Sequence, residues 1–469
     1  MDFPLFFLDH IGNRMLMAVV AIVHVLINHP FAVGAYPIVV LLEWWALRKG
    51  LPALDGLARK ITFLLFLITT TLGALTGVGI WLTAALIAPF GIGSLLRVFF
   101  SAWAFEWIIF IIEVILIVFY YVTWDKLTGV RKKWHVALGA ALAAFSWITM
   151  AVITAILGFM MNPGQWVSDV VMPQVNLLGA ILNPIYLPQL AFRTSYSMVT
   201  GGLMVLFMLS LFTNKESDLR AVTLRRVSLW ILAWIPFVAL GALWYWRVVP
   251  GFMKENVSVA LLSMKFSQWH GQFLWIVAGF AVSLVLVSVW GAVSPRRVPT
   301  VFLLISFFMG LWILGHFERA REFVRKPYII PGYMYANGVR VKEMPIFQRD
   351  GLLTYATYAR HRTVTEENKI EAGEDIFLLA CSRCHTSTGL NGVVNKFNAL
   401  YGDQWDPAAL KTFIRTMHTA RPYMPPFPGS SKEAEALAAW LIDLKARPRT
   451  IHGAQSAGVS IPPPKEGNQ

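Results

Sequence analysis

The sequence predicts an all-α fold: a polytopic membrane bundle of about eight transmembrane helices, with its N-terminus outside and a small helical domain at its C-terminus. The first observation is composition, because 57% of the residues are hydrophobic and only 14% are charged, against roughly 25% charged in an average soluble domain. The second is a series of long apolar runs between residues 13 and 317. The third is that basic residues gather in alternate loops between these runs.

Each apolar run is long enough to be a helix that crosses a hydrocarbon core of roughly 30 Å. Strands are excluded because no run alternates like a barrel strand, and lipid cannot satisfy an open sheet edge. Prolines 30 and 37 lie inside the first run and predict a kink there. The expected spans are 14–47, 61–88, 97–124, 134–160, 187–212, 228–247, 270–292 and 299–318.

The basic loops predict the orientation of these spans. They follow spans one, three, five and seven, whereas the intervening loops such as "APFGIGSL" are nearly free of Lys and Arg. The positive-inside rule therefore places both chain ends outside. The net charge of +14 is explained by these loops and does not indicate nucleic-acid binding. The start "MDFPLFFLDHIG" lacks the basic region and cleavage site of a signal peptide, so we expect the first span to be the anchor.

A change of composition divides the chain. We expect a transmembrane domain over 1–325, a Pro/Gly/Tyr-rich connector outside the membrane over 326–365, a helical domain over 366–447 and a disordered tail over 448–469. In the helical domain, "EENKIEAGEDIFLLA" and "SSKEAEALAAWLIDLK" read as the first and last helices. The last has a Ser followed three residues later by Glu, which favours a helix start.

The C-terminal domain contains both cysteines of the chain, Cys381 and Cys384, in "CSRCH". A disulfide, a redox-active pair or half of a zinc site would explain two cysteines, but none of these needs His385 directly after them. C-x-x-C-H is the attachment signature of c-type haem, in which the thiols bind the porphyrin and the His binds iron. The motif therefore predicts one covalent haem c. Because cytochrome c is matured on the outer side of bacterial membranes, this agrees with the predicted topology.

About 80 residues around this motif resemble a class I cytochrome c, on the strength of "CSRCH" and "MPPFPGSSKEAEALAAWL". The resemblance implies that Met424, which precedes a Pro just before the last helix, is the sixth iron ligand. Met417 and His418 are rival candidates. The alternative is that both are packing or surface residues of the preceding helix. Met ligation would raise the potential of a low-spin, electron-carrying haem.

Ionisable residues inside membrane spans are costly and are functional candidates by default. They are His24, His29, Glu43, Glu106, Glu113, His270, His316 and Glu318. Counted from the loops, four of them share a depth near the outer face: His24, Glu106, His270 and His316. Single packed histidines would have no reason to share a depth, so we expect this set to provide metal ligands for buried haem.

Glu106 and Glu113 lie seven residues apart in "FEWIIFIIE", which places both on one helix face. Such a pair suits a proton relay, with Glu106 also a possible iron ligand. The bland alternative is a packing hydrogen bond made by a protonated carboxyl group.

Residues 13–318 resemble subunit I of the cytochrome bd oxidases. The resemblance rests on segments such as "NRMLMAVVAIVHVL", "FEWIIFIIEVILIVFYYVTWDKL", "SWITMAVITAILGFMMNPG" and "LNPIYLPQLAFRTSYSMVTGG". It implies a bundle that binds two or three haems near the outer face and reduces oxygen to water. It aligns His24 with the haem-binding His of helix one of that family. It also aligns Glu106 with the first of two glutamates in helix three, and it puts Glu113 one residue away from the second. His316, four residues after Trp312, stands where that family has a haem-ligating Glu.

Two departures from that family concern the entry of electrons. Where the family has a haem-ligating His in helix five, this chain has Phe192 or Arg193, and helix seven offers no Met. The quinol-binding loop is reduced to roughly twenty residues around "VVPGFMKENVSVALLSMKFSQ". The sequence therefore favours cytochrome c over quinol as electron donor, and His270 could support a second b-type site.

Several arginines near the outer end could pair with haem propionates, as Arg pairs with carboxylates. They are Arg193, Arg321 and Arg325; the alternative is a solvated, charged helix end.

The sequence thus predicts a bd-like terminal oxidase of the bacterial cytoplasmic membrane, with its C-terminal domain in the periplasm. We expect one haem c, about two b-type haems (one of them a d-type variant as an alternative), a periplasmic electron-carrier protein and additional membrane subunits as partners. The runner-up is a non-catalytic electron-transfer subunit in which every iron is six-coordinate. A transporter with a sensor cytochrome is a weaker third interpretation, because no pair of broken helices shows inverted symmetry.

Overall fold

The computed structural model describes residues 3–164, 166, 177–262 and 270–446. Eight helical segments in this part of the chain are long and apolar enough to cross a membrane, which confirms the predicted all-α membrane fold. They are Asn13–Lys49, Pro52–Ile87, Pro89–Val122, Gly129–Phe159, Tyr186–Phe212, Asp218–Val248, Gln272–Val293 and Thr300–Val324. The predicted disordered tail lies outside the described residues.

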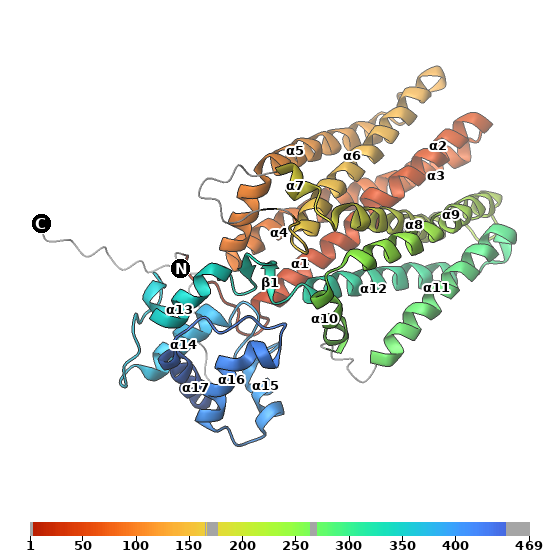
Figure 1. Ribbon diagram of the computed structural model, residues 1–469. Coiled ribbons are helices and arrows are strands. Elements are labelled where there is room, and N and C mark those ends of the chain that lie inside the picture. The colour runs from red at the N-terminus through yellow and green to blue at the C-terminus, as the bar shows by residue number, and fades with distance from the viewer. Residues whose placement is uncertain (1–2, 165, 167–176, 263–269, 447–469) are drawn as a thin grey trace, which may run out of the picture. The chain divides into compact units, whose positions relative to one another are not determined.

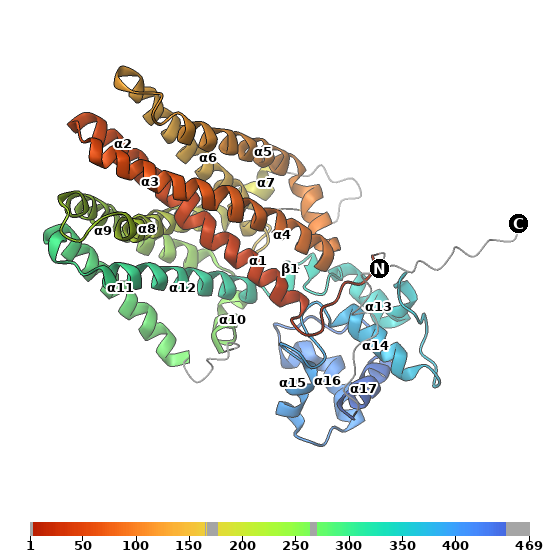
Figure 2. The ribbon, with the colours of Figure 1, turned by 180° about the vertical axis from the view of Figure 1, so that it is seen from behind.

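The chain forms two compact units, shown in Figures 1 and 2. The membrane unit comprises Val19–Leu82 and Gly91–Tyr333, and the C-terminal unit comprises Met1–Ala18, Thr83–Phe90 and Met334–Gln469. The division differs from the predicted domain boundaries because two early segments of the chain pack with the C-terminal residues.

The first four spans contain helices interrupted by short π- and 3-10 segments. Their elements are α1 (Asn13–Ile27), η1 (Asn28–Ala35), α2 (Tyr36–Lys49), α3 (Pro52–Ile68), η2 (Thr69–Gly73), α4 (Ala74–Ile87), α5 (Pro89–Val122), η3 (Gly129–Arg131) and α6 (Lys132–Phe159). Pro30 lies in η1, a π-helical segment, because a proline cannot donate the usual backbone hydrogen bond. The predicted irregularity of the first span is therefore present.

The second half of the membrane unit has the remaining spans and two shorter helices. Its elements are α7 (Leu177–Ile181), α8 (Tyr186–Phe212), α9 (Asp218–Val248), α10 (Gly251–Leu262), α11 (His270–Val293), η5 (Pro295–Arg297) and α12 (Thr300–Val324). Between α9 and α11 the chain has only residues 249–269, of which α10 is the described part. The short connection expected from the sequence is thus observed.

Helix α8 is the buried centre of the membrane unit, since most of its residues are shielded from the surface. The π-segment η1 packs directly on it. A Cβ at Gly34 would lie 1.9 Å from the Ser197 carbonyl oxygen, and one at Gly201 would lie 2.1 Å from the Gly34 carbonyl carbon. Small residues on both elements therefore allow the backbones to touch, as in membrane helix pairs generally. This approach brings η1 and α8 side chains close together.

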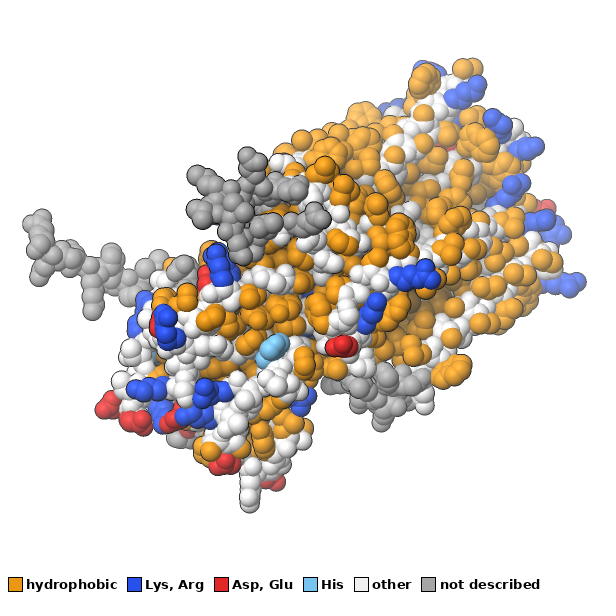
Figure 3. All heavy atoms as spheres, in the orientation of Figure 1, with side chains coloured by type: hydrophobic (Ala, Val, Ile, Leu, Met, Phe, Trp, Pro, Cys, Tyr) orange, Lys and Arg blue, Asp and Glu red, His pale blue; other side chains and the backbone are white. Residues whose placement is uncertain are grey.

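Side chains at the surface of the membrane unit separate by type. In Figure 3 hydrophobic side chains cover the long helices, while Lys and Arg gather at the helix ends on the right of the view. A lipid-facing belt that ends in basic residues is what the positive-inside rule predicts.

The C-terminal unit is built around two crossing helices. Strand β1 (Tyr328–Ile330) belongs to the membrane unit, and the C-terminal unit has β2 (Met334–Tyr335). The elements that follow β2 are η6 (Val341–Glu343), α13 (Met344–Asp350), η7 (Leu353–Tyr355), α14 (Lys369–Ala380), α15 (Val393–Tyr401), α16 (Pro407–Ala420) and α17 (Ser431–Ala446). Helices α14 and α17 cross at Gly373, where a Cβ would lie 2.2 Å from the Ala436 carbonyl oxygen. The rings of Phe377 and Trp440 pack beside this crossing, 4.7 Å apart.

The start of α17 has the reciprocal cap predicted from the sequence. The Ser430 N–H donates to Glu433 Oε2 at 2.7 Å, and the Glu433 N–H donates to Ser430 Oγ at 3.3 Å. The same carboxylate accepts the backbone N–H groups of Leu352 and Leu353, both at 2.8 Å. One side chain thus starts the last helix and fixes the segment after α13.

Candidate functional site

The CSRCH motif forms a single turn after α14. The backbone N–H groups of Cys384 and His385 both donate to the Cys381 carbonyl oxygen, at 3.0 and 2.9 Å. This turn places the two thiols and the imidazole on one short segment. The Nδ1–H of His385 points to the Asn391 carbonyl oxygen at 3.3 Å, which leaves Nε2 free for iron, as in metal-ligating histidines generally.

The two cysteines are not paired, and the thiol of Cys381 is not activated. Both are free thiols, and burial, aided by the neighbouring Cys384, raises the pKa of Cys381 to about 12. A redox-active pair needs a lowered thiol pKa instead. The surroundings therefore suit attachment to a porphyrin better than thiol–disulfide chemistry.

Arg383, the residue between the cysteines, provides a test of whether haem fits. Its Nη1 is buried and has no hydrogen-bond partner among the described residues, and burial lowers its pKa to about 10. A buried guanidinium donor without a partner is costly. A haem propionate would satisfy it, so the residues present fit a c-type haem.

Met424 lies in the loop between α16 and α17, and its rival His418 supports that loop. His418 Nδ1 donates to the Met424 carbonyl oxygen at 2.6 Å, and the Met424 N–H donates to the Arg421 carbonyl oxygen at 2.8 Å. His418 is therefore occupied in holding the methionine loop. Met424 as iron ligand stays a prediction, and the geometry favours it over His418.

In the membrane unit, His24 and His316 come from helices that touch each other. A Cβ at Gly315 would lie 3.5 Å from Ile22 Cγ2, so α12 packs on α1 within two residues of both imidazoles. His316 Nδ1 donates to the Trp312 carbonyl oxygen at 2.9 Å. His24 Nδ1 lies 3.1 Å from Thr76 Oγ1, which itself donates to the Leu72 carbonyl and so accepts from the imidazole.

These hydrogen bonds fix the same tautomer in both histidines, with the lone pair on Nε2. That arrangement is typical of metal-bound imidazole. In the described part of the chain no three His, Cys, Asp or Glu side chains form a cluster that could hold a metal ion. Zinc sites need three or four protein ligands, whereas haem iron takes one or two, so the donor set fits haem.

A third histidine, His29, is arranged differently. It belongs to a buried group that we call the arginine cluster: His29, Arg193, Glu318 and Arg321. Arg193 Nη1 donates to His29 Nε2 at 2.9 Å and Nη2 donates to Glu318 Oε1 at 2.5 Å. Because its Nε2 accepts from Arg193, His29 is not poised to bind iron.

The arginine cluster also shows the surroundings of Arg193, which stands near the place where the bd oxidases have a haem-ligating His in helix five. Arg193 is 2% exposed and Glu318 is 5% exposed, and Arg321 Nε donates to Glu318 Oε2 at 2.9 Å. Arg325 pairs with Glu322 instead. The predicted propionate partners thus have protein carboxylates as neighbours, although Arg193 Nε and Arg321 Nη1 remain buried and unpartnered among the described residues. The Arg193–Glu318 pair was not predicted from the sequence. Opposite charges at the same depth in spans five and eight were the signal that could have indicated it.

Glu113 and Glu106 differ in their surroundings on α5. Glu113 accepts hydrogen bonds from Ser146 Oγ at 2.6 Å and from Thr149 Oγ1 at 3.2 Å. Glu106 interacts electrostatically with Glu113 and has no hydrogen bond to another described residue. Of the two carboxyl groups, that of Glu106 is therefore the one without a hydrogen bond to another described residue. His270 is the first residue of α11, and its side chain lies outside the described ones.

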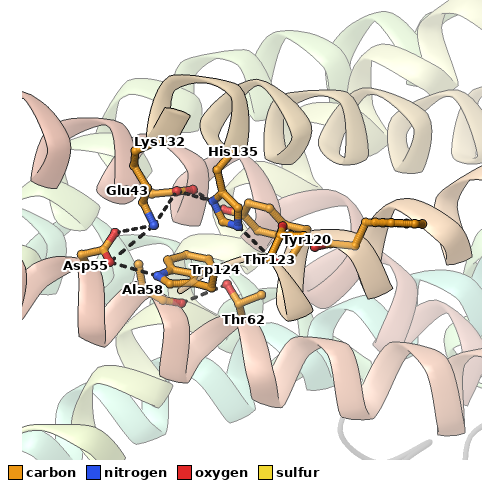
Figure 4. A network of polar contacts seen from close by, with 10 residues as sticks. Glu43, Asp55, Ala58, Thr62, Tyr120, Thr123, Trp124, Lys132 and His135 are labelled. Atoms are coloured by element: carbon orange, nitrogen blue, oxygen red, sulfur yellow. Dashed lines mark hydrogen bonds and ion pairs between the residues drawn. The ribbon is translucent and has the colours of Figure 1, made fainter. Parts of the chain in front are cut away.

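A second buried network lies where α2, α3, α5 and α6 end near the basic loops (Figure 4). We call it the loop-end network; its members are Glu43, Asp55, Tyr120, Trp124, Lys132 and His135. Glu43 accepts from His135 Nδ1 at 2.5 Å and from the Tyr120 hydroxyl at 2.7 Å, and Lys132 Nζ lies 3.1 Å from both Glu43 Oε1 and Asp55 Oδ1.

Sequence analysis singled out Glu43 but missed its partners. Lys132 belongs to the basic loop after the third span, and no local pattern relates Lys132 or His135 to Glu43. Both are buried. The signal that could have indicated the pair is that acidic Glu43 and basic Lys132 both lie near the loop end of their helices.

The geometry so far combines an attachment motif for c-type haem in one unit with two imidazoles, each hydrogen-bonded through Nδ1, inside a helical bundle. These features are those of a membrane-embedded haem protein. Residues 13–246 match the family described as cytochrome bd terminal oxidase subunit I, and residues 368–441 match the family described as cytochrome c oxidase, cbb3-type, subunit III. The chain is a cytochrome bd subunit I-like membrane protein with a C-terminal cytochrome c domain.

Among solved structures, the fold is similar to that of the bd oxidase from Geobacillus thermodenitrificans. The TM-score is 0.58 at 17% sequence identity, over 70% of this chain and 90% of that chain. No curated protein matches the chain significantly. The two family matches imply c-type and b-type haem and a multi-pass membrane location.

Proposed function

We propose that this protein is a bd-like terminal oxidase that receives electrons through its own c-type haem rather than from quinol. The observation that carries the proposal is the buried Arg193–Glu318 pair. It lies in the stretch of α8 where the resemblance to bd oxidases calls for a haem-ligating His. The connection between α9 and α11 is also short, only residues 249–269. Both features that would serve quinol are replaced, and a cytochrome c domain is present.

Each part of the chain has a separate role in this proposal. Cys381, Cys384, His385 and Met424 hold the c-type haem, and His24 and His316 offer Nε2 to haem in the bundle. Bound haem supplies one-electron transfer and, where an iron position is open, binding and reduction of oxygen. Glu113, hydrogen-bonded to Ser146 and Thr149, passes protons to the uncommitted carboxylate of Glu106.

We place the protein in the bacterial cytoplasmic membrane, with both chain ends on the periplasmic side. A periplasmic carrier would deliver electrons, and further membrane subunits would complete the complex. Residues 3–12 make hydrogen bonds to residues of the cytochrome domain. These contacts support the proposal that both ends of the chain lie on the same side of the membrane. Protease treatment of intact spheroplasts should release the cytochrome domain; protection of the domain would reverse the orientation.

The reduced protein should be titrated with carbon monoxide while its haem spectrum is recorded. An oxidase must keep one iron open, so part of the b-haem spectrum should shift and the c-haem bands should stay unchanged. Haem extraction should give both b and c haem. If no haem b is found, the assignment of His24 and His316 is wrong.

The second candidate is a six-coordinate electron-transfer subunit. It is favoured by one observation: His316 replaces the expected Glu, and its Nε2 and that of His24 are both available on touching helices. Two imidazoles on one iron would close the position that oxygen needs. Complete absence of a carbon monoxide response would select this candidate.

A further inference from the structure

The segment that precedes the first membrane helix lies against the haem-attachment loop. We call residues 3–12 the strap. The Phe7 ring is buried and meets the edge of Phe377, on the helix that leads into CSRCH, at 6.0 Å. The Leu390 N–H donates to the His10 carbonyl oxygen at 2.9 Å. The strap therefore packs on both sides of the motif within the C-terminal unit.

Asp9 makes the most specific contact of the strap. Its Oδ1 accepts the Ser387 N–H at 2.8 Å and the Ser387 hydroxyl at 2.6 Å. Asp9 is 8% exposed and Ser387 is fully buried. A buried carboxylate thus holds the backbone and side chain of the residue that lies two positions after His385. Hydrogen bonds donated to a carboxylate at these distances are among the stronger ones in proteins.

The fit between strap and loop is one of backbone against backbone. A Cβ at Gly389 would lie 2.3 Å from the His10 carbonyl oxygen, so only glycine permits the contact. Asn13 fixes the shape of the strap, because it accepts the Leu8 N–H at 3.1 Å and donates to the Phe6 carbonyl at 2.7 Å. On the loop side, Thr386 Oγ1 donates to the Leu390 carbonyl oxygen at 2.9 Å. The strap and the loop therefore each have internal hydrogen bonds that hold their backbone shape.

We propose that the strap is a built-in part of the c-haem site, and that Asp9 is a positioning residue for the iron ligand His385. This rests on the proposed function only in that the loop binds haem. Asp9 sets the path of residues 386–390, and that path places the Asn391 carbonyl that orients the imidazole. Its negative charge stabilises the oxidised, more positive haem and lowers the potential. Because the strap leads directly into α1, the haem loop is tethered to the start of the first span.

The test uses the full-length protein in nanodiscs and measures the c-haem midpoint potential and the ferric absorbance band of methionine-ligated haem. Asp9→Asn keeps the shape of the side chain and one acceptor oxygen but removes the charge. We expect it to favour the reduced haem by about threefold, or about 30 mV at 59 mV per tenfold. Asp9→Glu should recover part of the shift. Ser387→Ala should weaken the methionine band.

Asp406→Ala is the matched control, because Asp406 accepts the Ala409 N–H at 2.7 Å and caps α16 in the same unit. It should lower the melting temperature of the domain without moving the potential. An unchanged potential in Asp9→Asn together with an unchanged methionine band in Ser387→Ala, with covalent haem retained, would overturn the role of the strap. Absence of covalent haem in the unmodified protein would instead remove the proposed function. If Asp9→Asn does not accumulate, Ser387→Ala decides the question.

Discussion

The two buried polar groups of the membrane unit have similar residue types but differ in how completely they are satisfied. In the loop-end network every buried side-chain nitrogen and oxygen of the six described members has a partner. In the arginine cluster Arg193 Nε and Arg321 Nη1 have none among the described residues. An unmet buried donor costs about 1–3 kcal/mol. These two guanidinium donors therefore suit an acceptor that lies outside the described residues.

This difference separates a structural network from a candidate cofactor site. The loop-end network closes on itself: Lys132 bridges two carboxylates, Trp124 Nε1 donates to Asp55 at 3.0 Å, and the Lys132 ammonium lies 4.4 Å from the Trp124 ring centre. It fixes the helix ends near the basic loops. The arginine cluster offers N–H donors to an anionic group such as a haem propionate. The following substitutions test that division, beginning with the largest effect.

Glu43→Ala and Glu318→Ala should each destabilise the protein by about 3–5 kcal/mol, because each leaves buried cations without their carboxylate. The two variants should differ in their spectra. Glu43→Ala should keep the b-haem spectrum, whereas Glu318→Ala should alter it. Thermal unfolding in detergent and reduced-minus-oxidised spectra measure the two effects. An altered haem spectrum in Glu43→Ala would contradict a purely structural loop-end network.

His24→Ala and His316→Ala should weaken binding of b-type haem by about 10–100-fold or more, since loss of a mere outer-shell partner costs that much at metal sites. His135→Ala is the matched control, because it removes a buried imidazole from the loop-end network. It should lower stability and leave the haem content unchanged. Pyridine haemochrome analysis of purified protein gives the content. Equal losses in all three variants would mean that the histidines act through folding alone.

Arg193→Gln should lower the b-haem potential, because a positive charge that favours the reduced haem is lost. The expected change in the reduction equilibrium is about three- to tenfold, or about 30–59 mV. Lys132→Met removes a buried cation from the loop-end network and should leave the potential unaltered. Spectroelectrochemical titration compares them. A shift of equal size in Lys132→Met would show that distance from the arginine cluster does not matter.

Exposed charges in the C-terminal unit should have the smallest effect. Lys369 and Lys411 hold the pKa of Glu435 down, to about 2, by hydrogen bonds and charge. Because this pKa lies below the usual 4.5, its contribution to stability is present at neutral pH and is lost as pH falls from about 4.5 to 2. Glu435→Gln should lower the melting temperature slightly at pH 7, less so in high salt. A difference that grows toward acid pH would contradict this sign.

The sequence was sufficient for the features that depend on local pattern. Eight apolar runs predicted eight spans, because only a helix satisfies its backbone inside lipid. The C-x-x-C-H motif brings two thiols and an imidazole together, because those groups are adjacent along the chain. The cap at Ser430 and Glu433 followed for the same reason. The availability of Nε2 in His24 and His316 could not be predicted, because it depends on Thr76 from another helix and on which carbonyl accepts Nδ1–H.

By itself, the sequence determined the membrane class of this protein, its eight spans and its haem-attachment motif, since these follow from hydrophobicity and from neighbours in the chain. Only the tertiary structure decided that Arg193 pairs with Glu318, that Glu43 pairs with His135 and Lys132, and that Asp9 holds Ser387. Each of these pairs joins residues that are 89 or more positions apart in the chain. Their contact depends on helix register and on close approaches such as Gly34 against Gly201, which no local pattern specifies.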